Sequence, residues 1–167
     1  VAPWVKEMLA NGHDCFYHAN GGLSDYDAAT KSYQPLATDR HIIRVADLRA
    51  AGKVVEHNDG ASLLDMGDGV ALLEFHTKMN AIDQDIIDMA FKALERLDSD
   101  FDALVIGNNG EHFSAGANLF AVGVAAAQGQ FDALDKMIKA LQTATFKLRH
   151  APKPVVTAPH QMALGGG

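Results

Sequence analysis

The chain has few of the residues that indicate a disulfide-stabilised, membrane-spanning or nucleic-acid-binding protein. Its 167 residues include a single cysteine, Cys15, so no disulfide can form within it, and we expect a reducing, cytoplasmic location. No apolar run approaches the roughly 18 residues that cross a bilayer. Lysine and arginine number 14 against 21 aspartates and glutamates, a net charge of −7, whereas a general nucleic-acid binder needs a basic face.

Metal-binding and nucleotide-binding patterns are missing as well. The eight histidines form no His-x-x-x-His pair and no Cys-His cluster, so we predict no metal. The glycines at 165–167 do not match Gly-x-Gly-x-x-Gly, and no phosphate-binding Gly-x-x-x-x-Gly-Lys-Ser/Thr run occurs. We therefore predict no cofactor bound by these residues. The content of 48% hydrophobic and 21% charged residues is that of an ordinary globular protein.

The last hundred residues predict an α/β fold. Two apolar runs flank a Gly-Asp-Gly turn, which is a hairpin signal, and two later segments carry apolar residues at helical spacing. The expected elements are a hairpin at 61–66 and 70–75, a helix at 83–97, a strand at 103–108, a helix at 131–148 and a strand at 155–158. This order predicts parallel strands joined by right-handed helical crossovers.

The first 60 residues are less regular. A short amphipathic helix is expected within residues 1–20, where Trp4, Val5, Met8 and Leu9 share one helical face. Residues 21–60 are interpreted as a linker because they are mixed and polar. Within them, residues 42–50 fit a short helix, although their β-branched start leaves a strand open.

Two segments of small residues are candidates for a catalytic or binding site. The run His-Phe-Ser-Ala-Gly-Ala-Asn-Leu-Phe at 112–120 follows a buried-looking strand, and Ala-Leu-Gly-Gly-Gly closes the sequence at 163–167. Small residues leave backbone N–H groups open to approach. Two such loops brought together can form an oxyanion hole, which stabilises negative charge on a carbonyl oxygen. The alternatives are an ordinary tight turn before a helix for the first segment and a flexible tail for the second.

From about residue 61 onward the chain resembles the crotonase family, which acts on acyl-CoA thioesters. Four features occur in the family's order: the hairpin before Lys-Met-Asn-Ala-Ile at 78–82, the helix that follows, the loop Phe-Ser-Ala-Gly-Ala-Asn at 113–118, and Pro-Lys-Pro-Val-Val at 152–156 leading into the glycines. The resemblance implies the N-terminal half of a crotonase-like ββα superhelix. Residues 1–20 more weakly resemble the tail of a 3-hydroxyacyl-CoA dehydrogenase.

The resemblance also implies roles for individual residues. Ala115 and Gly166 would supply the two catalytic N–H groups. The residues implied to bind the acyl-CoA substrate are Lys78, Asn80, Gly116, Ala117 and Asn118. Two points stay open: Asn80 or Asp83 fits a helix cap equally well, and Asn118 stands where many relatives carry aspartate, so a role that needs a carboxylate is in doubt.

The same resemblance also implies how these residues fit into a longer protein. The chain looks cut at both ends, at the junction of a dehydrogenase and a hydratase module in a bacterial fatty-acid β-oxidation protein. The family's two acid–base glutamates would lie past Gly167, so we expect these residues alone to be inactive. NAD would belong to the dehydrogenase module, and we expect a homo-oligomer. The rival interpretation is a non-catalytic acyl-CoA-binding or assembly module on the same scaffold.

Overall fold

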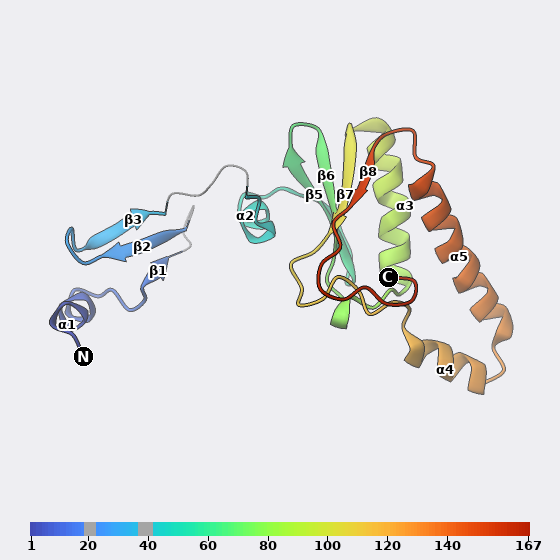
Figure 1. Ribbon diagram of the computed structural model, residues 1–167, viewed down its shortest axis with the longest axis horizontal. Coiled ribbons are helices and arrows are strands. Elements are labelled where there is room, and N and C mark those ends of the chain that lie inside the picture. Colours follow the sequence, from blue (N-terminus) through green and yellow to red (C-terminus); the bar gives the residue numbers. More distant parts are fainter. Residues whose placement is uncertain (19–22, 37–41) are drawn as a thin grey trace. The chain divides into compact units, whose positions relative to one another are not determined.

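The computed structural model describes residues 1–18, 23–36 and 42–167 of the chain. It contains two compact units, Val1–Ala51 and Gly52–Gly167. Figure 1 shows the elements of each unit, and the positions of the two units relative to each other are not determined.

The larger unit is built on a five-stranded sheet in which the strands follow their sequence order. Its strands are β4 (Val54–His57), β5 (Ala61–Gly67), β6 (Val70–Phe75), β7 (Ala103–Gly107) and β8 (Val155–Thr157). The first three pair antiparallel, whereas β6, β7 and β8 pair parallel. The parallel neighbours β7 and β8 both end at the same edge of the sheet, which becomes important for the site.

Helices fill the crossovers between the parallel strands. Helix α3 (Gln84–Ser99) joins β6 to β7, while α4 (Leu119–Ala127) and α5 (Phe131–Arg149) join β7 to β8. Figure 1 shows α3 beside the sheet and α5 beside α3. This arrangement confirms the predicted α/β order of hairpin, helix, strand, helix and strand.

Helix α3 begins where the sequence provides a cap. The side chain of Asp83 accepts a hydrogen bond from the Ile86 N–H at 3.1 Å, so Asp83 and not Asn80 is the cap. The buried apolar face of α3 comprises Ile86, Ile87, Met89, Ala90, Ala93 and Leu97. Burying a large aliphatic side chain stabilises by roughly 1.5–3 kcal/mol, against about 1 kcal/mol for a cap. Packing therefore contributes more than the cap to holding α3 on the sheet.

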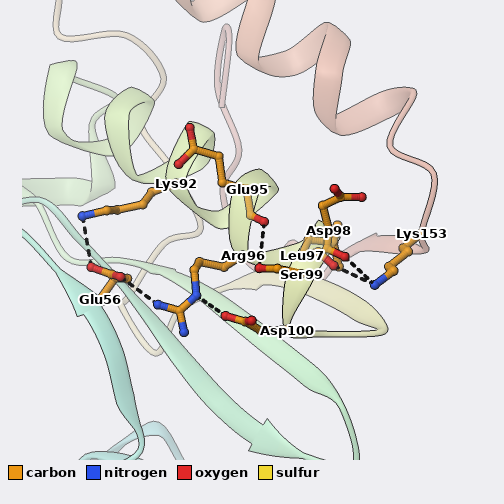
Figure 2. Close-up of polar contacts among 9 residues, drawn as sticks. All are labelled: Glu56, Lys92, Glu95, Arg96, Leu97, Asp98, Ser99, Asp100 and Lys153. Atoms are coloured by element: carbon orange, nitrogen blue, oxygen red, sulfur yellow. Dashed lines mark hydrogen bonds and ion pairs between the residues drawn. The ribbon is translucent and has the colours of Figure 1, made fainter.

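Strand β4 is part of the sheet, and the interpretation of residues 21–60 as a linker is wrong here. Figure 2 shows Glu56 of β4 bonded to two cations of α3: Lys92 at 3.0 Å and Arg96 at 2.9 Å. Arg96 also pairs with Asp100. The hydrogen bond and charge of Lys92, assisted by Arg96, lower the pKa of the Glu56 carboxyl. Residues 54–57 were missed because a four-residue strand with one charged side chain has little periodicity.

Lys153 joins the end of α3 to the start of β8. Its Nζ donates to three backbone carbonyls, those of Leu97 at 2.9 Å, Asp98 at 3.1 Å and Phe101 at 2.7 Å. Figure 2 shows the side chain reaching the carbonyls of Leu97 and Asp98 at the end of α3. An ammonium group suits this position because the last carbonyls of a helix have no partner within it and carry partial negative charge.

The smaller unit also has more structure than the sequence predicted. It contains α1 (Pro3–Ala10), the antiparallel strands β1 (Tyr17–His18), β2 (Ser24–Asp27) and β3 (Ser32–Pro35), and α2 (Val45–Ala50). Helix α1 matches the expected amphipathic helix. Strands β2 and β3 correct the linker interpretation a second time. Helix α2 settles the alternative at residues 42–50 in favour of a helix.

Helix α4 was not predicted, and it is unusual because none of its residues is buried. Leu119 is 78% exposed and Phe120 is 82% exposed. Its sequence has no helical amphipathicity because every residue except one glycine is apolar, so periodicity gave no signal. In the described parts of the chain, no helix combines the length and the apolar character needed to cross a membrane.

Candidate functional site

The two small-residue segments lie side by side at the edge where β7 and β8 end. Two backbone hydrogen bonds join residues 112–118 to residues 162–167: Ser114 N–H to Met162 O at 3.2 Å, and Leu164 N–H to Ser114 O at 3.0 Å. A third, Phe113 N–H to His160 O at 3.3 Å, lies just before the second of these segments. The parallel pairing of β7 with β8 therefore continues beyond the strands. We call residues 112–118 the first loop and residues 162–167 the second loop.

A third segment, the turn at residues 77–82, borders the first loop on another side. The Ile82 N–H donates to Gly116 O at 2.8 Å, and the Asn118 N–H donates to Ile82 O at 3.2 Å. The turn contains the 3₁₀ helix Lys78–Asn80 and precedes the Asp83 cap of α3. The first loop is thus held between the turn and the second loop.

Gly116 allows the two loops to approach this closely. Its φ is +82°, and a β-carbon added there would lie 2.4 Å from Leu164 O and 3.4 Å from Gly166 N. Any other residue would both strain the backbone and strike the second loop. The same measurement shows that Gly116 and the Gly166 N–H are neighbours, so the sequence-predicted pair of loops converges on one spot.

The N–H groups of the two predicted donors differ in their state. The Ala115 N–H donates to Met79 O at 3.1 Å, so it is already occupied by the turn. The Gly166 N–H takes part in no hydrogen bond within the described parts of the chain. The Gly116 N–H, next to Ala115, donates to Ser114 Oγ at 3.1 Å. In this conformation the Gly166 N–H is available to a ligand, whereas the Ala115 N–H is already hydrogen-bonded to Met79 O.

Asn80 and Ser114 brace the first loop from within. The Asn80 side chain is 5% exposed and donates to His112 O at 2.9 Å. The buried Ser114 hydroxyl donates to Asn80 O at 2.7 Å while accepting from Gly116. Asn80, expected to bind substrate, is therefore bonded to the loop itself. Ser114 was not singled out from the sequence, although a hydroxyl just before Ala-Gly was the available signal.

The remaining predicted substrate-binding residues lie around the first loop. Asn118 accepts a hydrogen bond from the Ala121 N–H at 3.1 Å and so caps α4, a task that asparagine performs as well as aspartate. Ala117 forms an isolated parallel bridge with Ile82. Lys78 is exposed on the turn, where its ammonium group faces solvent and can meet an anion.

An apolar cavity of about 770 Å³ adjoins the second loop. Its walls come from the sheet, α3, α5 and the glycines at the end of the chain, for example Leu73, Ile87, Phe113, Leu141, Gly166 and Gly167. Its size lies within the range of about 300–1,000 Å³ that small-molecule sites occupy. Gly166 is one of the lining residues, so its N–H, which has no hydrogen-bond partner in the described parts of the chain, lies beside this cavity.

Histidines flank both loops, and neither contact points to a metal. His160 Nε2 lies 2.9 Å from Gly110 O, and its ring packs edge-on against Phe113. His112 uses its carbonyl to accept from Asn80. Across residues 1–18, 23–36 and 42–167, no group of three or more His, Cys, Asp or Glu side chains could hold a metal ion.

Comparison with known proteins identifies the family. Residues 65–167, more than half of the chain, match the family model described as enoyl-CoA hydratase/isomerase. The chain therefore belongs to the enoyl-CoA hydratase/isomerase family, also called the crotonase family. The predicted fold class is confirmed, because the similar solved structures are crotonase-fold proteins.

Individual relatives extend this comparison. A Bacillus subtilis (strain 168) protein, whose name describes a 3-hydroxyacyl-CoA dehydrogenase, is 42% identical over 165 residues, which is 98% of this chain and 21% of that protein. A solved enoyl-CoA hydratase from Shewanella pealeana ATCC 700345 is 28% identical, with a TM-score of 0.57 over 64% of this chain and 41% of its own. The chain thus spans about a fifth of the B. subtilis relative and less than half of the solved hydratase.

Proposed function

We propose that this chain binds the thioester end of an acyl-CoA and stabilises its enolate for enoyl-CoA hydration or isomerisation. The observation that carries the proposal is the convergence of the first and second loops beside the free Gly166 N–H. Membership of the enoyl-CoA hydratase/isomerase family supports the same chemistry.

In the proposed complex, the thioester oxygen lies between the N–H groups of Ala115 and Gly166. When a bond to the substrate's β-carbon forms or a proton leaves its α-carbon, negative charge moves onto this oxygen. Two backbone donors on the loops stabilise that charge, and such stabilisation is the largest single contribution in many acyl-transfer and enolate-forming sites. Proton transfer is assigned to carboxylates of the intact protein outside residues 1–167.

The surrounding residues have supporting tasks in this proposal. Gly116 permits the loops to meet, while Asn80 and Ser114 hold the first loop in shape. Lys78, exposed on the adjacent turn, supplies a positive charge for a phosphate of CoA. The substrate contacts predicted for Ala117 and Asn118 are made through the backbone of the loop, since the Asn118 side chain is used to cap α4.

We also propose that the intact protein is a fatty-acid β-oxidation enzyme that carries NAD-dependent 3-hydroxyacyl-CoA dehydrogenase activity as well. The basis is the B. subtilis relative, whose similarity extends over 98% of this chain, including the unit Val1–Ala51. A Rickettsia prowazekii relative, 26% identical over 139 residues, is described by its name as a fatty acid oxidation complex trifunctional enzyme. Reduction of NAD by 3-hydroxybutanoyl-CoA tests this second activity.

The decisive experiment measures hydration of crotonyl-CoA by the intact protein and by two variants at Ala115. Ala115→Pro removes the N–H and is expected to lower the rate about 10²–10³-fold, the usual cost of one lost oxyanion donor. Ala115→Ser keeps the N–H and serves as the matched control. Circular dichroism confirms that both variants fold. A folded proline variant with a rate within about threefold of wild type contradicts the donor assignment, since that lies far below the expected loss.

One further outcome distinguishes the rival function. If the wild-type protein binds butanoyl-CoA but neither hydrates crotonyl-CoA nor isomerises a 3-enoyl-CoA above the buffer rate, the chain is an acyl-CoA-binding module and not a catalytic one. The same loop geometry would then act in binding alone.

A further inference from the structure

The turn next to the first loop has an unusual backbone. Met79 has φ of +57° and Asn80 has φ of +49°, so two consecutive residues with β-carbons occupy the left-handed region. Each such residue is disfavoured relative to the right-handed region. The surrounding contacts hold the turn in this state, and the most direct of them is the hydrogen bond from the Ala115 N–H to Met79 O at 3.1 Å.

That hydrogen bond occupies the donor that the proposed function needs. The Ala115 N–H cannot point fully at a thioester oxygen while it donates to Met79 O, whereas the Gly166 N–H is free to do so. Ala115 is partly exposed and Met79 is 57% exposed, so the contact lies where a ligand can reach it. In this conformation the site therefore offers one of its two proposed donors, the Gly166 N–H, to a ligand.

We propose that Met79 is a positioning residue. Its left-handed turn holds the Ala115 N–H in a hydrogen bond until the oxygen of an acyl-CoA thioester takes the place of Met79 O. This hydrogen-bonded turn is called the latch below. The proposal rests on the proposed function for the identity of the ligand. When the turn opens, Met79 leaves the left-handed region, and the strain it held is released. Part of the cost of breaking the hydrogen bond is thereby offset, so the latch is closed but easily displaced.

The latch predicts that two substitutions at Met79 act in opposite directions. Met79→Gly removes the left-handed penalty and favours the closed turn by roughly five- to thirtyfold. Met79→Val introduces a β-branched side chain, which tolerates positive φ least, and favours the open turn. Because Met79 is largely exposed, neither change opens a cavity in the core. For a ligand that binds only the open state, the apparent dissociation constant is the intrinsic one divided by the open fraction.

Hydrogen exchange of the Ala115 amide in the ligand-free intact protein tests the latch directly, by mass spectrometry with fragmentation that resolves the single amides of residues 112–118. We expect slower exchange in Met79→Gly, by roughly five- to thirtyfold, and faster exchange in Met79→Val. Asp68→Gly is the matched control: Asp68 has φ of +51° in the β5–β6 turn, away from the loops. It relieves the same kind of strain and should leave exchange at Ala115 unchanged relative to the other loop amides.

Binding of butanoyl-CoA, a saturated thioester that cannot be hydrated, forms the second arm. The dissociation constant should rise in Met79→Gly by the factor seen in exchange and fall in Met79→Val. Equal exchange rates at Ala115 in all three proteins would overturn the latch, even if butanoyl-CoA binds well and the proposed function stands. Absence of butanoyl-CoA binding to the wild-type protein would instead contradict the proposed function, and the exchange rates would still decide whether the turn holds the amide.

Discussion

Replacement of Gly116 by alanine is the most informative perturbation of the loop geometry. The added β-carbon would lie 2.4 Å from Leu164 O, a separation at which backbone must move. The left-handed conformation at φ of +82° costs an alanine roughly 1–2 kcal/mol. Forcing extra volume into a packed site costs about 1–3 kcal/mol more. If the loops stay together, Gly116→Ala therefore loses about 2–5 kcal/mol of stability, the sum of these two costs.

The loops can escape part of this cost by separating. The Leu164 N–H to Ser114 O hydrogen bond then breaks, and Gly166 moves away from the first loop. If the loops stay together, urea unfolding shows the lower stability. If they separate, crotonyl-CoA hydration falls about 10²–10³-fold, the usual cost of one lost donor. Gly123→Ala in α4 is the control, because nothing lies within 4 Å of the added carbon and its φ is not positive. Wild-type stability together with wild-type hydration in Gly116→Ala would refute the close approach.

Four further predictions follow from the structure. Lys153→Met removes the donor to three carbonyls at the end of α3. Leaving such groups unsatisfied costs about 1–3 kcal/mol of stability, which urea unfolding measures. An unchanged urea midpoint would mean that water replaces the ammonium group. Asp83→Ala should cost about 1 kcal/mol through the lost cap of α3, and no change in thermal midpoint would argue against capping. The pKa of Glu56 is lowered by Lys92 and Arg96, so its contribution to stability is present above its ordinary pKa and is lost as pH falls through the lowered value; Glu56→Gln should flatten that acid limb of the unfolding curve. Phe120 is 82% exposed on the apolar helix α4, so residues 1–167 alone should self-associate in sedimentation experiments and Phe120→Asp should reduce this, whereas a clean monomer at high micromolar concentration would contradict it.

The sequence predicted the larger unit well because its elements carry strong local signals. The hairpin around the Gly-Asp-Gly turn and the 3.6-residue spacing of α3 and α5 depend on side chains that face one core. Strand β4 and helix α4 carry no such signal. Strand β4 is four residues long. It pairs with the neighbouring strand β5, and the ion pairs of Glu56 join it to Lys92 and Arg96, which lie far along the chain.

The candidate site was only partly predictable. The two segments of small residues in the sequence indicated both loops, and the contact between the loops follows from the parallel pairing of β7 and β8. The motif could not show that the Ala115 N–H is engaged by Met79 O, nor that the Asn80 amide faces the loop interior. Both facts depend on the left-handed turn at Met79 and Asn80, which ordinary residues rarely adopt. The roles of Ala115 and Gly166 in catalysis stay predictions.

The carbonyl stretch of bound butanoyl-CoA, carrying ¹³C at the thioester carbon, tests the central claim most directly. Two N–H donors on the oxygen weaken the C=O bond, so the infrared band should shift to lower frequency in the complex with the intact protein. The shift should shrink in Ala115→Pro and persist in Ala115→Ser. If all of the protein has butanoyl-CoA bound and the thioester band still lies at its solution frequency, the two N–H groups do not bind the thioester oxygen.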